Sequence, residues 1–419
     1  MGRDVLVVGA GLAATQTVAE LREAGFDGRI RVLGAEGVPP YDRPQLSKHL
    51  LDRRTPAWLR DEVGVDLAAL ADEVRLGTPA RGLLPGGPRP TVLTDEGWVA
   101  ADDVVLATGA HAVRVPGWEA ALTLHTAADA DRLRAALPVG ARLVVVGAGW
   151  VGAEVAGVVA AAGHPVTVLE AAGAPLAGAV GERVGGLTTR WYDEAGITLV
   201  THARVVAVRP DGVDLAGGRT VPADVVLAAV GARPTTAWLG RALPLDRDGG
   251  VRVDEAFRVQ ARRAPGPDGA PAPAEAAVVP HVWAVGDVAR RTSRRHGTVA
   301  GGHWDGALRG PRVLVGHLLG RPVPPPGDDP APYVFSTQMG HDLALFGSPG
   351  RGDEVVLRGN GGPGGGWSAV WLSDERVTAV LVVDRPREVG AVRRLFAGDQ
   401  LPRVDRATVA DPGVPLRAG

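Results

Sequence analysis

The chain has 419 residues, of which 45% are hydrophobic, and its formal net charge is −2. This length allows two or three domains, and near neutrality excludes a global attraction to nucleic acid or to anionic membranes. No uninterrupted apolar stretch is long enough to span a membrane and no signal-peptide pattern is present, so we expect a cytoplasmic protein. The absence of cysteine excludes disulfide relays, thiolate metal sites and cysteine-bound iron–sulfur clusters. Redox chemistry would have to use a bound cofactor directly, and no metal site is predicted.

The first strong pattern is the apolar run DVLVVGAGLAA, which enters a Gly-rich turn and an Ala-rich helical stretch. Gly9, Gly11 and Ala14 fit the GxGxxG/A fingerprint of a dinucleotide-binding strand–helix–strand unit. In this fingerprint the first glycine makes the tight turn and the second lets the backbone approach a pyrophosphate. The third small residue allows close helix–strand packing. The next strand is predicted at 29–33, and Glu36 beyond it is the acid expected to bind a ribose hydroxyl.

Lys48 is the one lysine among the 45 lysine and arginine residues, and it lies in the run PYDRPQLSK. A lysine ammonium is a compact point charge, whereas arginine presents a broad planar fork. A tight site beside a cofactor can therefore accept lysine and exclude arginine. The alternative is chance survival of one lysine in an arginine-biased composition.

A second dinucleotide unit begins at 142–152 with RLVVVGAGWVG, in which Gly147, Gly149 and Gly152 fit the same fingerprint. The strand after its helix ends at Glu170. An acid there accepts from the 2′-hydroxyl of an adenosine ribose and repels a 2′-phosphate, which favours NADH over NADPH. An ordinary helix-capping role is the alternative for Glu170.

Glu154 lies two residues past Gly152, on the first turns of the second predicted helix. A buried ammonium needs a nearby carboxylate to stay charged. Glu154 is therefore a candidate partner of Lys48, and a solvated helix glutamate is the alternative.

Further strands end in turns at 104–110, 225–234 and 282–289. In the last of these, Asp287 is predicted to follow a strand and to begin a helix. Its carboxylate would accept from a sugar-alcohol hydroxyl while the helix N-terminus faces an anionic group, unless it is a plain helix cap. Trp304, on the next helical stretch, is a candidate to lie against a flat ring, with a core or interface tryptophan as the alternative.

A basic cluster follows this turn, formed by Arg290, Arg291, Arg294 and Arg295. It fits a docking face for an acidic protein and equally fits a solvated charge run. Nucleic acid is not an expected partner, because no aromatic platform or known binding motif accompanies the cluster.

The rest of the chain contains two breaks and a further domain. Residues 261–280 are rich in Pro, Ala and Gly and are predicted to be a disordered surface insertion, and residues 321–332 are predicted to be a linker. Alternating strand-like patterns at 334–383, with a Gly-rich loop at 359–366, and a helical stretch near 386–397 predict a small α+β domain.

Several motifs occur together in one order: PYDRPQLSK, VVLATGA, VVVGAGWVGAE, VTVLE, VWAVGDVA and GGHWDGALRG. With them the chain resembles, over almost its whole length, the FAD-dependent NAD(P)H:ferredoxin reductases of the putidaredoxin reductase and biphenyl-dioxygenase ferredoxin reductase type. Apoptosis-inducing factor is a related protein. The resemblance implies a glutathione-reductase-like α/β fold with two Rossmann-type dinucleotide-binding domains and a small C-terminal α+β domain. The implied boundaries are 1–112 and 246–322 for the FAD domain, 113–245 for the NAD domain, and 330–410 for the C-terminal domain.

The resemblance also implies site residues. FAD contacts are implied at Gly9, Gly11, Ala13, Ala14, Arg43, Lys48, Ala80, Thr108, Gly109, Gly286, Asp287 and Trp304. NAD contacts are implied at Gly147, Gly149, Trp150, Gly152, Glu170 and Gly231. The family's lysine–glutamate pair beside flavin N5 maps to Lys48 and Glu154 as catalytic residues. Among the departures from the family, the ribose acid of close relatives aligns with Ala35, an FAD-holding arginine aligns with His125, and Gly302 stands where an acid usually precedes the His-Trp pair. Glu36 is then expected to replace the missing ribose acid.

The implied function is electron transfer from NADH through FAD to a small acidic iron–sulfur ferredoxin that serves a monooxygenase or dioxygenase. The basic cluster would be the ferredoxin docking site, and the chain would be a monomer or a homodimer. One alternative is an NADH oxidase or quinone reductase. Another is a redox-responsive interaction flavoprotein resembling apoptosis-inducing factor.

Overall fold

The computed structural model describes residues 2–261, 277–325, 327–359 and 365–417. Most of the predicted insertion at 261–280 and of the Gly-rich loop at 359–366 therefore lies outside the described residues. Within the described ranges, no helix combines the length and the apolar character that crossing a membrane requires.

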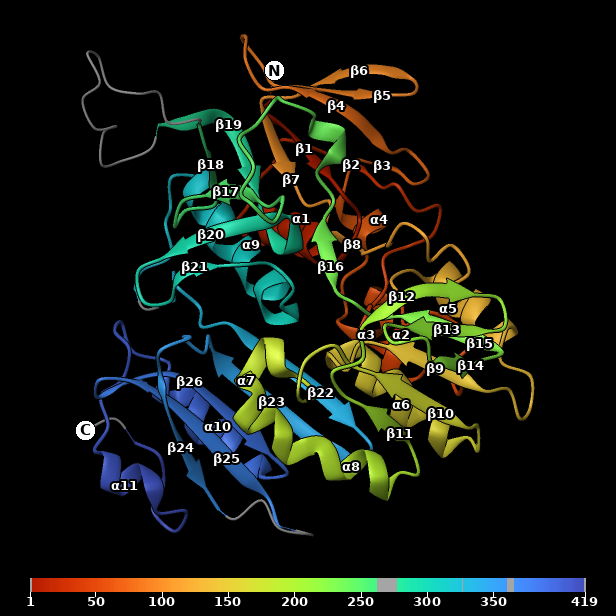
Figure 1. Cartoon of the computed structure of the whole chain (residues 1–419). Coiled ribbons are helices and arrows are strands. Elements are labelled where there is room, and N and C mark those ends of the chain that lie inside the picture. The colour runs from red at the N-terminus through yellow and green to blue at the C-terminus, as the bar shows by residue number, and fades with distance from the viewer. Residues whose placement is uncertain (1, 262–276, 326, 360–364, 418–419) are drawn as a thin grey trace, which may run out of the picture.

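A nine-stranded sheet forms the upper part of Figure 1. Its central strands are parallel, and β1 and β7 in the middle carry continuous buried apolar runs, as expected for a sheet buried on both faces. In sheet order the strands are β21 (Gly297–Val299), β20 (Ala289–Ser293), β17 (Val251–Val253), β18 (Arg258–Gln260), β19 (Val278–Ala284), β7 (Asp103–Leu106), β1 (Asp4–Val8), β2 (Arg29–Leu33) and β3 (Glu73–Arg75).

The helices α1 (Leu12–Glu23) and α9 (Trp304–Leu318) pack against each other beside this sheet. The order β1–α1–β2 confirms the first predicted strand–helix–strand unit. Smaller elements accompany it: the helices α2 (Gln45–Lys48), α3 (Leu59–Glu62) and α4 (Leu67–Leu70), and the antiparallel sheet of β4 (Ala80–Leu84), β5 (Thr91–Thr94) and β6 (Gly97–Ala100).

A second, four-stranded parallel sheet lies at the right of Figure 1. Its order is β11 (Thr198–Val200), β10 (Val166–Leu169), β9 (Leu143–Val146) and β15 (Val225–Ala228). The order β9–α6–β10, with α6 at Trp150–Ala161, confirms the second predicted unit. This part also contains α5 (Ala127–Ala135), α7 (Ala177–Gly185), α8 (Thr189–Glu194) and the antiparallel sheet of β12 (Val205–Arg209), β13 (Gly212–Leu215) and β14 (Thr220–Pro222).

The two connections between these sheets run side by side as an antiparallel pair, β8 (Ala110–Ala112) and β16 (Ala232–Pro234). After β16 the chain returns at once to the first unit, because Leu239 and Leu243 are buried in the same core as β1 and β7. The residues just before the predicted boundary at 245/246 therefore pack with the first unit rather than with the second.

The C-terminal part is a five-stranded antiparallel sheet, in the order β22 (Tyr333–Gln338), β23 (His341–Gly347), β26 (Arg376–Val383), β25 (Trp367–Ser373) and β24 (Glu354–Arg358). It carries α10 (Pro386–Leu395) and α11 (Arg406–Ala410). Pro386 occupies the first turn of α10, where its missing N–H costs no hydrogen bond. The predicted small α+β domain is confirmed. The chain is thus of the predicted α/β class, with two sheets whose central strands are parallel and in each of which one strand leads into a Gly-rich turn.

Candidate functional site

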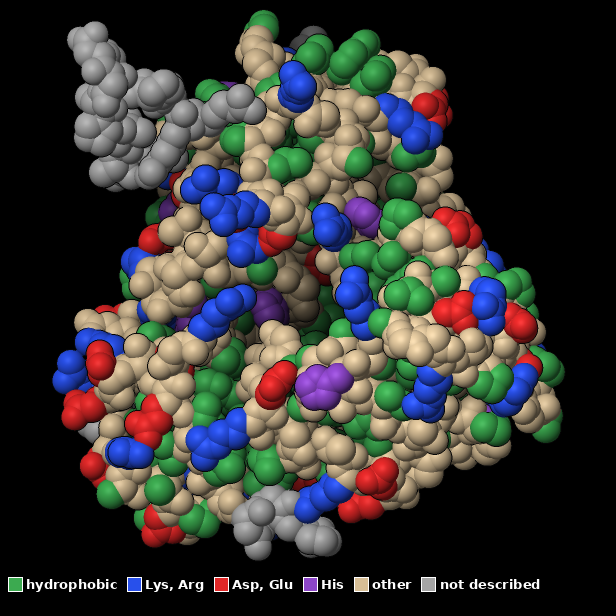
Figure 2. Space-filling model, in the orientation of Figure 1, with side chains coloured by type: hydrophobic (Ala, Val, Ile, Leu, Met, Phe, Trp, Pro, Cys, Tyr) green, Lys and Arg blue, Asp and Glu red, His purple; other side chains and the backbone are tan. Residues whose placement is uncertain are grey.

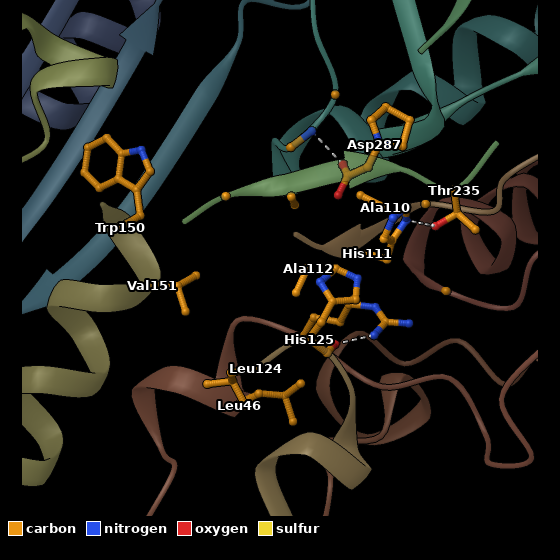
Figure 3. A pocket seen from close by; sticks show the side chains of 18 of the residues that line it. Leu46, Ala110, His111, Ala112, Leu124, His125, Trp150, Val151, Thr235 and Asp287 are labelled. Carbon is orange, nitrogen blue, oxygen red and sulfur yellow. Dashed lines mark hydrogen bonds between the residues drawn. The ribbon is translucent and has the colours of Figure 1, made fainter. Parts of the chain in front are cut away.

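A cavity of about 1540 Å³ lies between these parts of the chain. It exceeds the roughly 300–1,000 Å³ that is typical of a pocket for one small ligand. Figure 2 shows the hollow between the upper part of the molecule and its two lower parts, and Figure 3 shows side chains that line it. The lining includes most of the predicted site residues: Gly9, Gly11, Ala13, Glu36, Arg43, Lys48, Ala80, Thr108, Gly109, Gly147, Gly149, Trp150, Glu154, Glu170, Gly231, Asp287 and Trp304.

The first glycine of each turn is required by backbone geometry. Gly9 has φ +123°, and a Cβ there would lie 2.1 Å from the Ala107 carbonyl oxygen. Gly147 has φ +104°, and a Cβ would lie 2.5 Å from the Ala229 carbonyl oxygen. Each turn therefore passes directly over the end of a neighbouring strand, which only glycine permits.

The second glycine of each turn borders open space. A Cβ on Gly11 or Gly149 would meet no atom within 4 Å. These glycines are the N-caps of α1 and α6, and neither helix start has a side-chain cap or an acid in its first turn. The first backbone N–H groups of both helices can thus bind an anion. In a dinucleotide-binding unit this is where the pyrophosphate lies, at the N-terminus of the helix. The geometry fits one dinucleotide at each turn.

Three predicted contact residues do not line the cavity. Ala14 is fully buried in the first core, and a Cβ on Gly152 would lie 2.1 Å from the Gly147 carbonyl oxygen. Gly286 has φ +76°, and a Cβ there would lie 2.8 Å from the Ala13 side chain. These small residues shape the turns by close packing.

Glu36 is bound by two side chains of the PYDRP segment. Its Oε1 accepts from Arg43 at 2.5 Å, and its Oε2 accepts from the Tyr41 hydroxyl at 2.6 Å. Arg43 also donates to the His125 carbonyl oxygen at 2.6 Å, a contact drawn in Figure 3. Burial raises the pKa of Tyr41, so its hydroxyl stays protonated and donates. Burial, and then the Arg43 charge, lowers the pKa of His125, which favours its neutral form.

Lys48, at the end of α2, pairs with Glu154 of α6 through Nζ and Oε1. Glu154 is 5% exposed and Lys48 13%, so this is a largely buried ion pair and Glu154 is not a solvated helix residue. Ser47 donates to the other carboxylate oxygen of Glu154 at 2.5 Å. The predicted lysine–glutamate pairing is thus present in the structure, on the wall of the cavity.

Two aromatic residues stand beside this pair. The Lys48 ammonium lies 5.1 Å from the ring centre of Phe335 on β22, and Phe335 meets the edge of Trp304 at 5.9 Å. The indole Nε1 of Trp304 donates to Asp42 Oδ1 at 2.7 Å, which fixes the orientation of the ring. All four residues line the cavity, so a flat ring bound there would meet a charged and an aromatic surface together.

Asp287 lies in the cavity wall but does not begin an α-helix. Residues Gly286–Val288 form a single 3-10 turn, and strand β20 follows directly. The helix predicted there is wrong, because Ala289–Ser293 pairs with β17 and β21. Asp287 Oδ1 accepts from the Gly302 backbone N–H at 2.8 Å, as Figure 3 shows, so the carboxylate is held by the turn before α9.

Glu170 accepts from two backbone N–H groups, that of Ala148 in the second Gly-rich turn at 2.7 Å and that of Ala172 at 2.8 Å. Arg204, from the segment before β12, lines the same cavity and forms no ion pair with any residue that the structure describes. Arg204 was not predicted as a site residue, because it lies far beyond the residues that directly follow Glu170 in sequence. Folding brings it close, since Ala203 donates its backbone N–H to the Glu170 carbonyl oxygen at 2.8 Å.

Acidic residues from distant segments pair with the predicted basic cluster. Arg290 pairs with Asp246 and Asp248, and Arg291 with Asp329. Arg294 pairs with Glu255 and Asp328 but stays 40% exposed, whereas the Arg295 side chain is 4% exposed. The cluster therefore carries much less uncompensated positive charge than its sequence indicates, and Arg294 is its most accessible member.

The chain matches the family model described as pyridine nucleotide-disulphide oxidoreductase over residues 3–306, and the model described as reductase C-terminal over residues 333–419. It is 34% identical to the anthranilate 1,2-dioxygenase system ferredoxin–NAD(+) reductase component of Burkholderia cepacia, over 98% of each chain. It is 31% identical to the biphenyl dioxygenase system ferredoxin–NAD(+) reductase component of Paraburkholderia xenovorans strain LB400, over 93% of this chain and 92% of the relative.

Solved structures agree with these likenesses. A chain in the crystal structure of the covalent putidaredoxin reductase–putidaredoxin complex is 27% identical, with a TM-score of 0.86 over 99% of this chain and 97% of that one. The resemblance and the fold class predicted from the sequence are both confirmed.

Proposed function

The chain belongs to the pyridine nucleotide-disulphide oxidoreductase family, and we propose that it passes electrons from NADH through FAD to a small iron–sulfur ferredoxin of a monooxygenase or dioxygenase system. The observation that carries the proposal is one cavity with an uncapped Gly-rich helix start at each dinucleotide unit and the Lys48–Glu154 pair on its wall. The relatives named as ferredoxin–NAD(+) reductases over nearly their whole length support the ferredoxin as acceptor.

In this proposal FAD lies at the first turn, over Gly9 and Gly11, and NADH at the second, over Gly147 and Gly149. Bound flavin supplies the chemistry, since it accepts hydride and passes on single electrons. Lys48 places a positive charge beside the flavin ring, and Glu154 holds that charge in position. The remaining proposed contacts with FAD are Ala13, Glu36, Arg43, Ala80, Thr108, Gly109, Asp287 and Trp304, and those with NAD are Trp150, Glu170 and Gly231.

Glu36 and Arg43 would act together at the FAD end. Because Arg43 occupies one oxygen of Glu36 and Tyr41 the other, a ribose hydroxyl would share a carboxylate that is already hydrogen-bonded. A carboxylate has about four lone-pair sites, so such sharing is possible. The arrangement supports Glu36 as the substitute for the acid missing at Ala35.

The domain division forms part of the proposal. The nine-stranded sheet takes strands from both 1–112 and 246–322, which supports one FAD domain built from two segments. The sheets within 113–245 and 330–410 support the NAD and C-terminal domains. A cytoplasmic location and a monomeric or homodimeric state stay predictions.

The central test is the cofactor and its reduction. The purified protein should be yellow, should release FAD on denaturation, and should reduce a ferredoxin rapidly with NADH under anaerobic conditions. A colourless protein that FAD cannot reconstitute would refute the proposal. Fast oxygen consumption without ferredoxin would favour an NADH oxidase, and slow reduction without ferredoxin turnover would favour a redox-responsive interaction protein.

The docking site has a separate test. We propose that an acidic ferredoxin docks near Arg290, Arg291, Arg294 and Arg295, with Arg294 as the main contact because it is the most exposed. Arg294→Glu should raise the KM for ferredoxin and weaken its salt dependence, while NADH reduces the flavin at the wild-type rate. Arg142→Glu is the matched control, since Arg142 is also an exposed arginine paired with an acid. An unchanged KM in Arg294→Glu would place docking elsewhere.

A further inference from the structure

The C-terminal sheet contributes a side chain to the buried ion pair. Ser336 of β22 donates from Oγ to Glu154 Oε1 at 2.6 Å, across 182 positions of sequence. Ser336 is 2% exposed, and its oxygen accepts from Gln338 Nε2 at 3.1 Å. A continuous hydrogen-bonded chain therefore runs from Gln338 through Ser336 and Glu154 to Lys48.

Glu154 is consequently held by donors from two other parts of the molecule. Oε1 accepts from both Lys48 and Ser336, and Oε2 accepts from Ser47. Ser47 and Lys48 belong to the first unit, Glu154 to the second and Ser336 to the C-terminal sheet. Because the donors approach from two separate elements, α2 and β22, the carboxylate plane has a single orientation that satisfies all three.

The backbone fixes how closely β22 approaches α6. A Cβ on Gly157, one turn after Glu154, would lie 3.0 Å from the Met339 backbone nitrogen. Met339 has φ +49° and Gly340 φ +84°, in the tight turn that joins β22 to β23. The missing side chain at Gly157 lets this turn lie directly on the helix, and that contact brings Ser336 within hydrogen-bond distance of Glu154.

We propose that Ser336 is a positioning residue of the redox site, through which the C-terminal domain orients Glu154 and thereby fixes the Lys48 ammonium. The inference rests on the proposed function for its meaning, since it assumes that Lys48 acts on bound flavin. Without the Ser336 hydroxyl, Glu154 loses one of three donors and Gln338 Nε2 loses its acceptor. The carboxylate can then turn about its axis, and Lys48 samples positions away from the cavity wall.

The single lysine makes a direct test possible in FAD-free protein. An amine-selective reagent can modify only Lys48 and the chain N-terminus, and peptide mass analysis separates the two. Since a hydrogen bond to a charged group is among the stronger ones, Lys48 should be labelled about tenfold faster in Ser336→Ala than in the wild type. Thr337→Ala is the matched control, because Thr337 is exposed on the same strand and donates to Asp342 at 2.8 Å instead. It should label at the wild-type rate.

A second measurement uses the loaded protein. Ser336→Ala should lower the flavin midpoint potential and slow anaerobic reduction by NADH about tenfold, with the KM for NADH close to wild type. In Ser336→Cys the side chain is a weaker donor of similar size, so its midpoint potential and reduction rate should lie between those of the wild type and Ser336→Ala. Thermal unfolding of each variant checks that it is folded.

The outcomes separate this inference from the proposed function. If NADH fails to reduce the wild-type flavin, the proposed function is wrong, whereas the labelling result in FAD-free protein still tests the role of Ser336. If Ser336→Ala matches the wild type in both Lys48 labelling and midpoint potential, Ser336 does not position the pair and the inference is overturned.

Discussion

Replacing Lys48 with arginine keeps the charge and changes only the shape of the side chain. The site around the ammonium is closely occupied: Glu154 takes one contact, and the Phe335 ring lies 5.1 Å from Nζ. Both oxygens of Glu154 already accept from serine hydroxyls, Ser336 and Ser47. A guanidinium needs two parallel N–H contacts for its best pairing with a carboxylate, and the serine hydroxyls already occupy one lone-pair site on each oxygen.

The expected size of the effect follows from this geometry. Forcing a larger group into a packed site costs about 1–3 kcal/mol, and loss of a charged hydrogen bond costs about 1.5–3 kcal/mol. A loss of that order at the flavin slows its reduction by NADH roughly ten- to hundredfold. Lys48→Ala should slow reduction at least as much, and it should also destabilise the fold because Glu154 stays buried without its cation.

Stopped-flow reduction under anaerobic conditions is the assay, with FAD content measured for each variant. FAD binding should be mostly retained, since the pyrophosphate site at Gly11 lies on another element. Glu154→Ala should be similarly slow, and the double variant with Lys48→Ala should be less than additive because the two residues act as one unit. Arg60→Lys is the control for exchanging lysine and arginine outside the cavity, because Arg60 is exposed on helix α3. A wild-type rate in Lys48→Arg would mean that the lone lysine is a compositional accident.

Three further predictions concern the dinucleotides and pH. Glu170 should give at least a tenfold preference for NADH over NADPH, about 1.4 kcal/mol, and Glu170→Ala should narrow it; equal kcat/KM for both in the wild type would refute the assignment. Gly11→Val should weaken FAD binding and Gly149→Val should raise the KM for NADH, each without unfolding the protein because a Cβ at either position meets no atom within 4 Å; the reverse pattern would exchange the two sites. Burial, and then the Arg295 charge, lowers the pKa of His296 to about 4. As the pH falls from about 6.5 towards 4, His296 binds a proton in the unfolded chain but not in the folded chain. This difference lowers the free energy of unfolding by up to about 3 kcal/mol. His296→Phe should therefore flatten the loss of thermal stability in that range, and an identical pH profile would contradict this.

Local patterns were enough to predict the two dinucleotide units. Gly9 and Gly147 are required where a turn crosses a strand end, and the apolar runs before them form fully buried strands. The apolar run and the Gly-rich turn are contiguous in sequence, so the residue pattern alone indicates them, although the strand ends that the turns cross come from distant residues. The sequence made Glu154 a candidate partner of Lys48 but left a solvated glutamate open, because nothing local joins residues 106 positions apart. The family resemblance was needed to select the pairing and to place it beside flavin N5.

Other features depend on tertiary contacts that the sequence does not display. The acids that compensate the basic cluster, such as Asp246 and Asp329, lie in separate segments and meet the arginines only after folding. The expected helix after Asp287 fails for a related reason. Ala289–Ser293 finds strand partners on both sides, and sheet pairing outweighs the local preference that a Gly-Asp turn indicates.

The absence of cysteine gives the geometry of the cavity wall its importance. The family model is described by pyridine nucleotide and disulphide chemistry, yet this chain has no thiol with which to form a disulfide. Electrons that reach a flavin here must leave it without a thiol relay. The side chains around the flavin then set its reduction potential. Among them Lys48 is a largely buried cation, oriented by contacts that join three parts of the fold. A redox site assembled in this way exists only when the first unit, α6 and β22 are docked together. Mutations that loosen the contact of Gly157 with Met339 should consequently alter flavin chemistry before they unfold any single domain.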